Sequence, residues 1–85
     1  LAHGEMLIVM DNIQRENEGD LIFAAQFSTP EKINFLITHT GGIICAPMTR
    51  KRALELGLHT MTSRNTDRHG TNFTVSCDHI SSTTG

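Results

Sequence analysis

The sequence predicts an α+β fold of the α/β type, in which helices flank a mixed sheet. Apolar runs and amphipathic stretches follow one another along the 85 residues in the order strand, strand, helix, strand, helix, loop and strand. With 38% hydrophobic and 19% charged residues, the composition is typical of a globular unit rather than a disordered segment. No internal repeat or low-complexity linker divides the sequence, so we expect residues 1–85 to belong to one domain.

Four apolar segments are predicted to be strands. Residues 6–10 form an unbroken apolar run that ends at two turn-forming residues, which indicates a short strand buried on both faces. Residues 21–25 and 43–48 are the second and third runs, and Pro47 ends the third strand or places it at a sheet edge. Residues 71–78 alternate apolar and polar side chains, as half-buried strands do.

Two helices are predicted from their start signals. Ser28 or Thr29 can cap the first helix and Pro30 suits its first position, so we expect a helix from about residue 30 to 39. Thr49 can cap a second helix that Gly57 ends. The apolar positions expected on the inner sides of these helices are Ile33, Leu36 and Ile37 in the first, and Ala53, Leu54 and Leu56 in the second.

Charge and cysteine spacing exclude several classes of function. The net charge of −2 provides no basic excess for nucleic-acid binding, and residues 50–52, three consecutive cations, fit a solvated surface. No run approaches the roughly 20 apolar residues of a membrane span. Cys45 and Cys77 lack the paired spacing of a structural zinc site, and they fit a reducing, cytoplasmic compartment.

The densest charge lies between the first two predicted strands, at Asp11, Arg15, Glu16, Glu18 and Asp20. In an extended segment the last three of these would share one face, where their carboxylates would repel one another. A hard divalent cation such as Mg²⁺ would relieve that repulsion, and Arg15 could bind a phosphate or carboxylate in a bidentate manner. A solvated acidic turn is the alternative, but a position between two strands favours a functional loop.

Four segments carry a family resemblance. They are residues 15–20 (RENEGD, preceded by the apolar run that leads into Val9-Met10-Asp11), 42–49 (GIICAPMT), 65–75 (NTDRHGT followed by FTV) and 83–85 (TTG). In this order they resemble the 3,4-dihydroxy-2-butanone-4-phosphate synthases over nearly the whole chain. The resemblance implies the fold of that family, with this chain as the N-terminal part of an incomplete domain.

The resemblance also implies a reaction and a set of site residues. Family members convert D-ribulose 5-phosphate into L-3,4-dihydroxy-2-butanone 4-phosphate and formate, use Mg²⁺ or Mn²⁺, and act as homodimers. Carried over by position, the metal would be bound by Glu16, the catalytic residues would be Glu18 and Cys45, and the substrate would contact Arg15, Glu16, Asp20 and Thr84. A buried apolar thiol is the alternative for Cys45, and a loop-capping hydroxyl is the alternative for Thr84.

The chain departs from the family pattern by its length. It lacks the family's second metal ligand, a histidine in a GHTEA-like segment, so we expect the 85-residue chain alone to be inactive and poorly folded. His69 invites a catalytic role because histidine titrates near neutral pH, although its polar loop fits a surface position. None of the five histidines has the spacing of a metal site, and we expect none to be a ligand.

Two other classes of function are open to this sequence. One is a non-catalytic module of the same fold with a structural or interaction role. The other is a related fold that binds nucleotides or RNA, which would favour cations where Glu16, Glu18 and Asp20 stand. The sequence leaves undecided whether the parent enzyme is monofunctional or fused to a GTP cyclohydrolase II domain.

Overall fold

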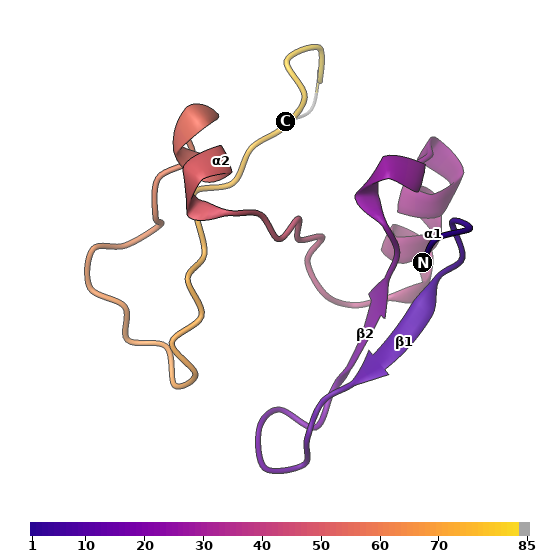
Figure 1. Cartoon of the computed structure of the whole chain (residues 1–85), viewed down its shortest axis with the longest axis horizontal. Helices are drawn as coiled ribbons and strands as arrows, with labels where there is room; N and C mark the ends of the chain where they lie inside the picture. Colours follow the sequence, from indigo (N-terminus) through magenta and orange to yellow (C-terminus); the bar gives the residue numbers. More distant parts are fainter. Residues whose placement is uncertain (84–85) are drawn as a thin grey trace. The chain divides into compact units, whose positions relative to one another are not determined.

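A computed structural model describes residues 1–83 of the chain. The chain divides into two compact units, Leu1–Ala46 and a second that begins at Pro47. The first unit contains a β-hairpin and the helix α1, and the second contains the helix α2 (Figure 1). Each unit is therefore described by itself, and the predicted single domain stays a prediction.

The first unit is built on an antiparallel hairpin of β1 (Leu7–Met10) and β2 (Gly19–Ile22). The register pairs Val9 with Asp20 and Met10 with Gly19. The first predicted strand is confirmed within its bounds. The second begins two residues earlier than expected, inside the acidic segment, and it ends at Ile22 because the chain then turns into a short 3-10 helix, η1 (Ala25–Phe27).

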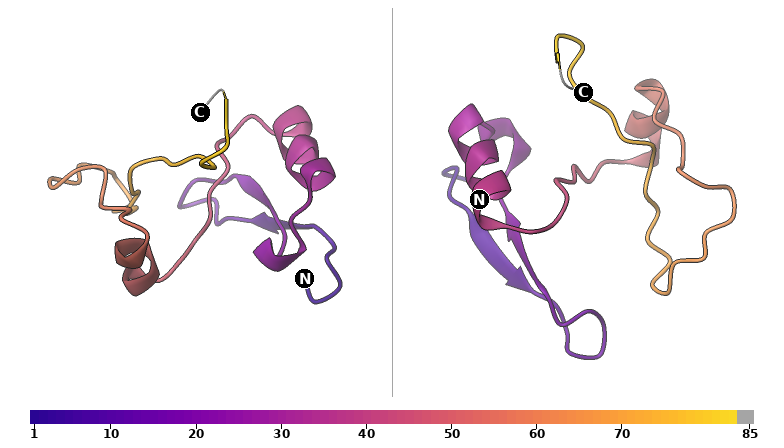
Figure 2. Two further views of the ribbon diagram at one scale, coloured as in Figure 1. Left: turned by 90° about the horizontal axis from the view of Figure 1, so that it is seen from above. Right: turned by 180° about the vertical axis from the view of Figure 1, so that it is seen from behind.

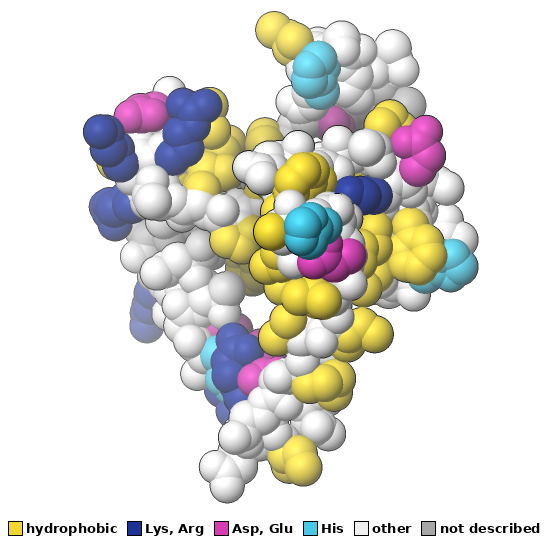
Figure 3. Space-filling view, turned by 45° about the vertical axis from the view of Figure 1, so that its right-hand side comes forward, with side chains coloured by type: hydrophobic (Ala, Val, Ile, Leu, Met, Phe, Trp, Pro, Cys, Tyr) yellow, Lys and Arg dark blue, Asp and Glu magenta, His cyan; other side chains and the backbone are white. Residues whose placement is uncertain are grey.

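The expectation that the first strand is buried on both faces is wrong. All four residues of β1 are exposed, and the side chain of Ile8 reaches 72% exposure. A sheet of two strands offers each face little cover, and Figure 3 shows many apolar side chains on the molecular surface. The apolar run therefore forms the predicted strand without the predicted burial.

Helix α1 (Pro30–His39) confirms the first predicted helix. The hydroxyl of Thr29 accepts a hydrogen bond from the Lys32 N–H at 3.2 Å, and Pro30 occupies the first turn. Of the apolar positions expected to face inward, Leu36 is buried and Ile33 is half-buried, but Ile37 is exposed. Figures 1 and 2 show α1 at the end of the hairpin that lies opposite the loop joining its strands.

Helix α2 (Arg50–Glu55) confirms the second predicted helix. The Thr49 hydroxyl accepts from the Arg52 N–H at 3.1 Å. At the other end, Gly57 adopts a left-handed φ of 73°, and the N–H of Leu58 donates to the carbonyl of Ala53 at 2.8 Å. These are the features of a Schellman motif, for which glycine carries no steric penalty. Ala53 is buried as expected, whereas Leu54 and Leu56 are exposed, contrary to expectation.

The third and fourth predicted strands do not form in the described residues. Residues 43–48 carry no strand assignment, and residues 71–78 contribute only an isolated bridge between Thr60 and Thr74. Strand hydrogen bonds need a neighbouring segment, and these residues find no continuous partner. Helices combined with a two-stranded sheet agree with an α+β fold, while the larger mixed sheet stays a prediction. Within residues 1–83, no helix is long and apolar enough to cross a membrane.

Candidate active site

The loop between β1 and β2 is closed by its own backbone. The N–H of Asp11 donates to the carbonyl of Glu18 at 2.9 Å, which extends the strand pairing by one residue pair. Inside the loop, the N–H groups of Arg15 and Asn17 both donate to the carbonyl of Asn12. Asn17 has a φ of 51°, in the left-handed region that asparagine tolerates better than most residues. The acidic motif therefore lies on a defined turn that leads into a strand.

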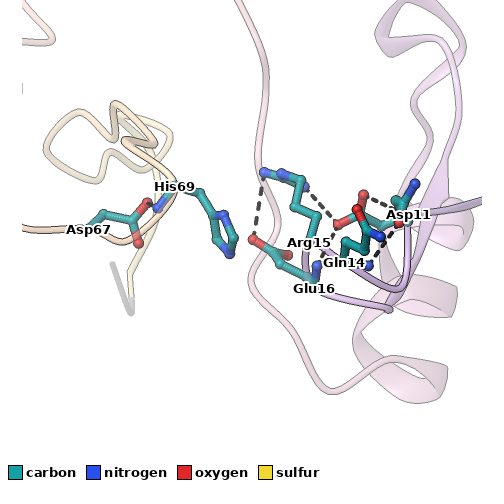
Figure 4. A network of polar contacts seen from close by, with 7 residues as sticks. Asp11, Gln14, Arg15, Glu16, Asp67 and His69 are labelled. Atoms are coloured by element: carbon teal, nitrogen blue, oxygen red, sulfur yellow. Dashed lines mark hydrogen bonds and ion pairs between the residues drawn. The ribbon is translucent and has the colours of Figure 1, made fainter.

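Asp11 is the acceptor at the centre of this loop. Its Oδ2 accepts from Arg15 Nη1 at 2.9 Å and from the N–H of Glu16 at 3.0 Å, while its Oδ1 accepts from the N–H of Asn12 at 2.7 Å. The other side of the Arg15 guanidinium faces Glu16, with 3.6 Å between Nη2 and Oε1 (Figure 4). Arg15 is thus held between two carboxylates at the bend of the hairpin.

The charge of this group is set by the same contacts. Desolvation alone would raise the pKa of Asp11, but the N–H groups of Asn12 and Glu16, with the Arg15 guanidinium, together lower that pKa below its usual value. The hydrogen bond to Asp11 raises the pKa of Arg15, and the charges of Asp11 and Glu16 add to the effect. Both side chains are therefore charged around neutral pH.

The prediction that Glu16, Glu18 and Asp20 share one face is wrong. That prediction assumed an extended chain, but the left-handed bend at Asn17 breaks the alternation between Glu16 and Glu18. Glu16 stays in the loop beside Arg15. Glu18 and Asp20 lie on the far side of the bend, two residues apart where the chain has become extended. The acids therefore form two groups.

A hollow of about 420 Å³ in the first unit brings three predicted site residues together. Glu18 and Asp20 line it from the start of β2, and Cys45 lines it from the segment after α1. Leu36 and Thr40 form part of the wall on the α1 side. Arg15 and Glu16 do not line the hollow, but they precede Glu18 directly in the hairpin loop.

Neither cysteine is the buried apolar thiol that the sequence allowed as the alternative for Cys45. Cys45 is exposed rather than buried, and its thiol makes one long contact to the carbonyl of Ile43 at 3.9 Å. Cys77 is exposed as well. An open thiol on the wall of the hollow is available to a ligand, which a buried apolar thiol would not be. Thr84 lies outside the described residues.

The candidate site offers the oxygen donors that a hard cation prefers, but too few of them lie together to hold one. The carboxylate of Glu16 is the type of oxygen donor that Mg²⁺ prefers, and 40% of its side chain is exposed. However, no group of three or more His, Cys, Asp or Glu side chains within residues 1–83 could hold a metal ion. Glu16 could therefore act as one ligand among several, with the remaining oxygen atoms coming from substrate or from other protein groups.

A second polar loop lies in the second unit and contains His69. Asp67 Oδ2 accepts from the N–H groups of His69 at 3.1 Å and Thr71 at 2.9 Å, a contact drawn for His69 in Figure 4. The N–H of Thr71 makes the largest contribution to lowering the pKa of Asp67. The ring of His69 is exposed, as expected for a surface histidine. This loop borders a smaller hollow of about 260 Å³.

Sequence reasoning gave no role to Asp11 or Asp67. A usable signal was present, because aspartate at the start of a turn often accepts hydrogen bonds from backbone N–H groups further along the chain. In both loops the aspartate precedes the charged residues that were singled out, Arg15 and Glu16 in one and His69 in the other. Their function in the structure is to fix the backbone of those neighbours.

The acidic hairpin, its fixed arginine and the hollow beside them make up the candidate site. The sequence model of the 3,4-dihydroxy-2-butanone 4-phosphate synthase family matches residues 1–85. The chain belongs to this family, which confirms the resemblance seen in its four segments.

Individual relatives match over the same length. A 3,4-dihydroxy-2-butanone 4-phosphate synthase of Oceanobacillus iheyensis is 51% identical over 85 residues, which are 100% of this chain and 41% of that protein. Proteins called riboflavin biosynthesis protein RibBA from Bacillus mycoides and Bacillus cereus are 54% identical, and the chain covers 21% of each. The chain thus spans less than half the length of these relatives. It matches no solved structure.

Proposed function

We propose that this chain supplies the N-terminal part of an enzyme that converts D-ribulose 5-phosphate into L-3,4-dihydroxy-2-butanone 4-phosphate and formate in riboflavin biosynthesis. Membership of the synthase family over residues 1–85 supports the reaction. The observation that carries the site is the arrangement of Glu18, Asp20 and Cys45 around one hollow, next to a loop in which Arg15 is already oriented.

In this proposal the two groups of acids have different tasks. Glu18, on the wall of the hollow, removes a proton from a carbon next to the substrate carbonyl and returns protons later in the reaction. Asp20 accepts hydrogen bonds from substrate hydroxyls, and Cys45, which also lines the hollow, contacts the substrate. Enolisation is followed by loss of a hydroxyl as water, skeletal rearrangement, addition of one water molecule and release of formate. The two products together contain all atoms of the substrate, so the net reaction needs neither oxidant nor added water.

The loop supplies the charge recognition. Arg15 presents guanidinium N–H groups to the anionic substrate, and Glu16 contributes a carboxylate oxygen to Mg²⁺ or Mn²⁺ and a contact to the substrate. A bound divalent cation would offset the negative charge that develops on substrate oxygens during proton removal. Thr84 is proposed to contact the substrate on the family resemblance alone. The proposed enzyme acts as a homodimer in the cytoplasm.

The test is a graft of this chain into its Oceanobacillus relative. Residues 1–85 replace the 85 matched residues of that protein, and the purified graft is assayed for formate release from ribulose 5-phosphate with Mg²⁺. We expect formate release and growth of a riboflavin auxotroph that lacks its own synthase. A graft that folds, by circular dichroism and a cooperative melting transition, but releases no formate would contradict the proposal.

A matched pair of variants tests the role of Glu18. General acid–base catalysis contributes about 10²–10⁴-fold, so Glu18→Gln should lower kcat of the graft by about a hundredfold or more. Glu31→Gln makes the same chemical change at an exposed position in the first turn of α1, and it should leave kcat unchanged. Equal activity in the two variants would remove Glu18 from the mechanism.

The isolated 85-residue chain is a separate case. It provides Glu16 as a single proposed metal ligand and spans 41% of the Oceanobacillus protein, so we expect it to release no formate by itself. The measurement is the same formate assay with Mg²⁺ and no partner chain. Turnover by the isolated chain would show that the part of the Oceanobacillus protein outside the match is not required for catalysis.

A further inference from the structure

We infer that Asp11 is a positioning residue, which holds the Arg15 guanidinium and the Glu16 backbone in the orientation that the site uses. This inference rests on the proposed function for its meaning, but it stands on contacts within one short loop. Asp11 follows β1 directly, so its backbone is fixed by the strand pairing, with its N–H bonded to the carbonyl of Glu18 at 2.9 Å. A carboxylate fixed at that point can impose its geometry on the turn that follows it.

Three donors converge on the two oxygens of Asp11. Oδ2 accepts from Arg15 Nη1 and from the Glu16 N–H, at 2.9 and 3.0 Å, and Oδ1 accepts from the Asn12 N–H at 2.7 Å. The Asp11 side chain is 18% exposed, whereas the Arg15 side chain is 49% exposed. Asp11 therefore faces the inside of the loop and points away from solvent, while the residues that it holds remain accessible.

The contacts of Asp11 reach both proposed functional residues of the loop by different routes. Arg15 is held through its side chain, which leaves its second terminal nitrogen to face outward, 3.6 Å from the Glu16 carboxylate. Glu16 is held through its backbone N–H, so its carboxylate stays unblocked by Asp11 itself. A preoriented arginine and carboxylate lose less conformational entropy when a ligand binds than flexible side chains would.

Asp11→Asn is a sharp perturbation because it keeps the shape of the side chain. An asparagine has one acceptor oxygen where aspartate has two, and its amide group can only donate. If the oxygen faces Asn12, the amide confronts the Arg15 guanidinium and the Glu16 N–H. If the oxygen faces Arg15, the Asn12 N–H loses its acceptor. Either orientation breaks the set of contacts without changing side-chain volume.

The first measurement needs no activity and uses the graft, in which the rest of the Oceanobacillus protein is present. NMR follows amide exchange at Glu16, the side-chain Nε–H signal of Arg15, and the line broadening that added Mn²⁺ causes at both residues. In Asp11→Asn we expect faster Glu16 exchange, a shifted Arg15 signal and an apparent Mn²⁺ dissociation constant about tenfold higher, as for loss of a group that supports a metal ligand. Asp78→Asn, the same change at an exposed position of the second unit, should match the unmodified graft.

The second measurement separates positioning from chemistry. In the graft, Asp11→Asn should raise KM for ribulose 5-phosphate about tenfold and change kcat by less than about twofold, because it weakens binding that is present before the chemical step. A graft without any activity would contradict the proposed function, and the exchange and Mn²⁺ results would then decide the role of Asp11. Unprotected Glu16 in the unmodified graft, or Asp11→Asn with unchanged Mn²⁺ binding, would overturn the inference.

Discussion

Leu36 offers the clearest test of how the hairpin unit is held together. It is 9% exposed and is one of the two hydrophobic residues that are buried within residues 1–83. Its side chain contributes to the wall of the hollow that Glu18 and Asp20 also line. Replacing Leu36 with alanine removes most of that packing and keeps the helix backbone intact.

The expected loss follows from this burial. Burying a leucine side chain stabilises a protein by about 1.5–3 kcal/mol, and Leu→Ala substitutions in cores cost about 2–5 kcal/mol. Because the hollow beside Leu36 lets neighbouring groups relax, we expect the lower end, about 2 kcal/mol. That corresponds to a change of about 30-fold in the folding equilibrium. A chain of this length has little stability in reserve, so the change is large.

Ile37→Ala is the matched control on the same helix. Ile37 is 65% exposed, so its truncation should change the free energy of unfolding by less than about 0.5 kcal/mol, and alanine favours the helix slightly more. Urea unfolding of both variants in the graft, followed by far-ultraviolet circular dichroism, measures the difference. Equal effects at positions 36 and 37, or no effect at either, would refute the assignment of Leu36 to a packed interior.

Three further predictions concern separate features of the chain. Thr29→Ala should destabilise α1 by about 1 kcal/mol because the Lys32 N–H loses its acceptor, and Thr29→Ser should restore most of this helicity, as measured by circular dichroism. The pKa of Asp67 lies below its unfolded value of about 3.9, so its stabilisation of the loop is complete above that pH and is lost as the pH falls through the lowered pKa. The protection of the Thr71 N–H, measured as its exchange rate relative to an unstructured amide at the same pH, should fall in that acidic window, and in Asp67→Asn it should be low at every pH. Cys45 and Cys77 are exposed, so both should react with an aromatic disulfide reagent without denaturant, and a single reacting thiol would contradict this.

Helices were predictable from the sequence because a helix satisfies its hydrogen bonds within one segment. Thr29 and Pro30 mark the start of α1, and Thr49 and Gly57 mark both ends of α2, through contacts between residues a few positions apart. Strands depend on partners that local patterns do not specify. Residues 7–10 find a partner across a short loop, whereas residues 43–48 are equally apolar and remain unpaired among the described residues. Their apolar pattern is typical of a paired strand, but no segment among the described residues pairs with them.

The candidate site was predictable in its members but not in its arrangement. The family resemblance identified Glu18, Asp20 and Cys45, and the structure places all three on one hollow. The prediction of an extended chain over residues 16–20 was wrong because the bend depends on the φ angle of Asn17. Residue type favours such an angle but does not fix it. Asp11 was missed because its contribution is made through hydrogen bonds to neighbours rather than through an exposed reactive group.

The left-handed conformation of Asn17 has a consequence for the whole acidic segment. It places Glu16 apart from Glu18 and Asp20. The three carboxylates therefore do not gather at one point, where they would repel one another unless a cation were bound. Glycine or aspartate could take over this position with little steric strain, whereas valine or isoleucine would favour a straight chain and drive the acids back onto one side. The left-handed backbone of Asn17 therefore keeps the acidic side chains of this hairpin apart without a bound cation.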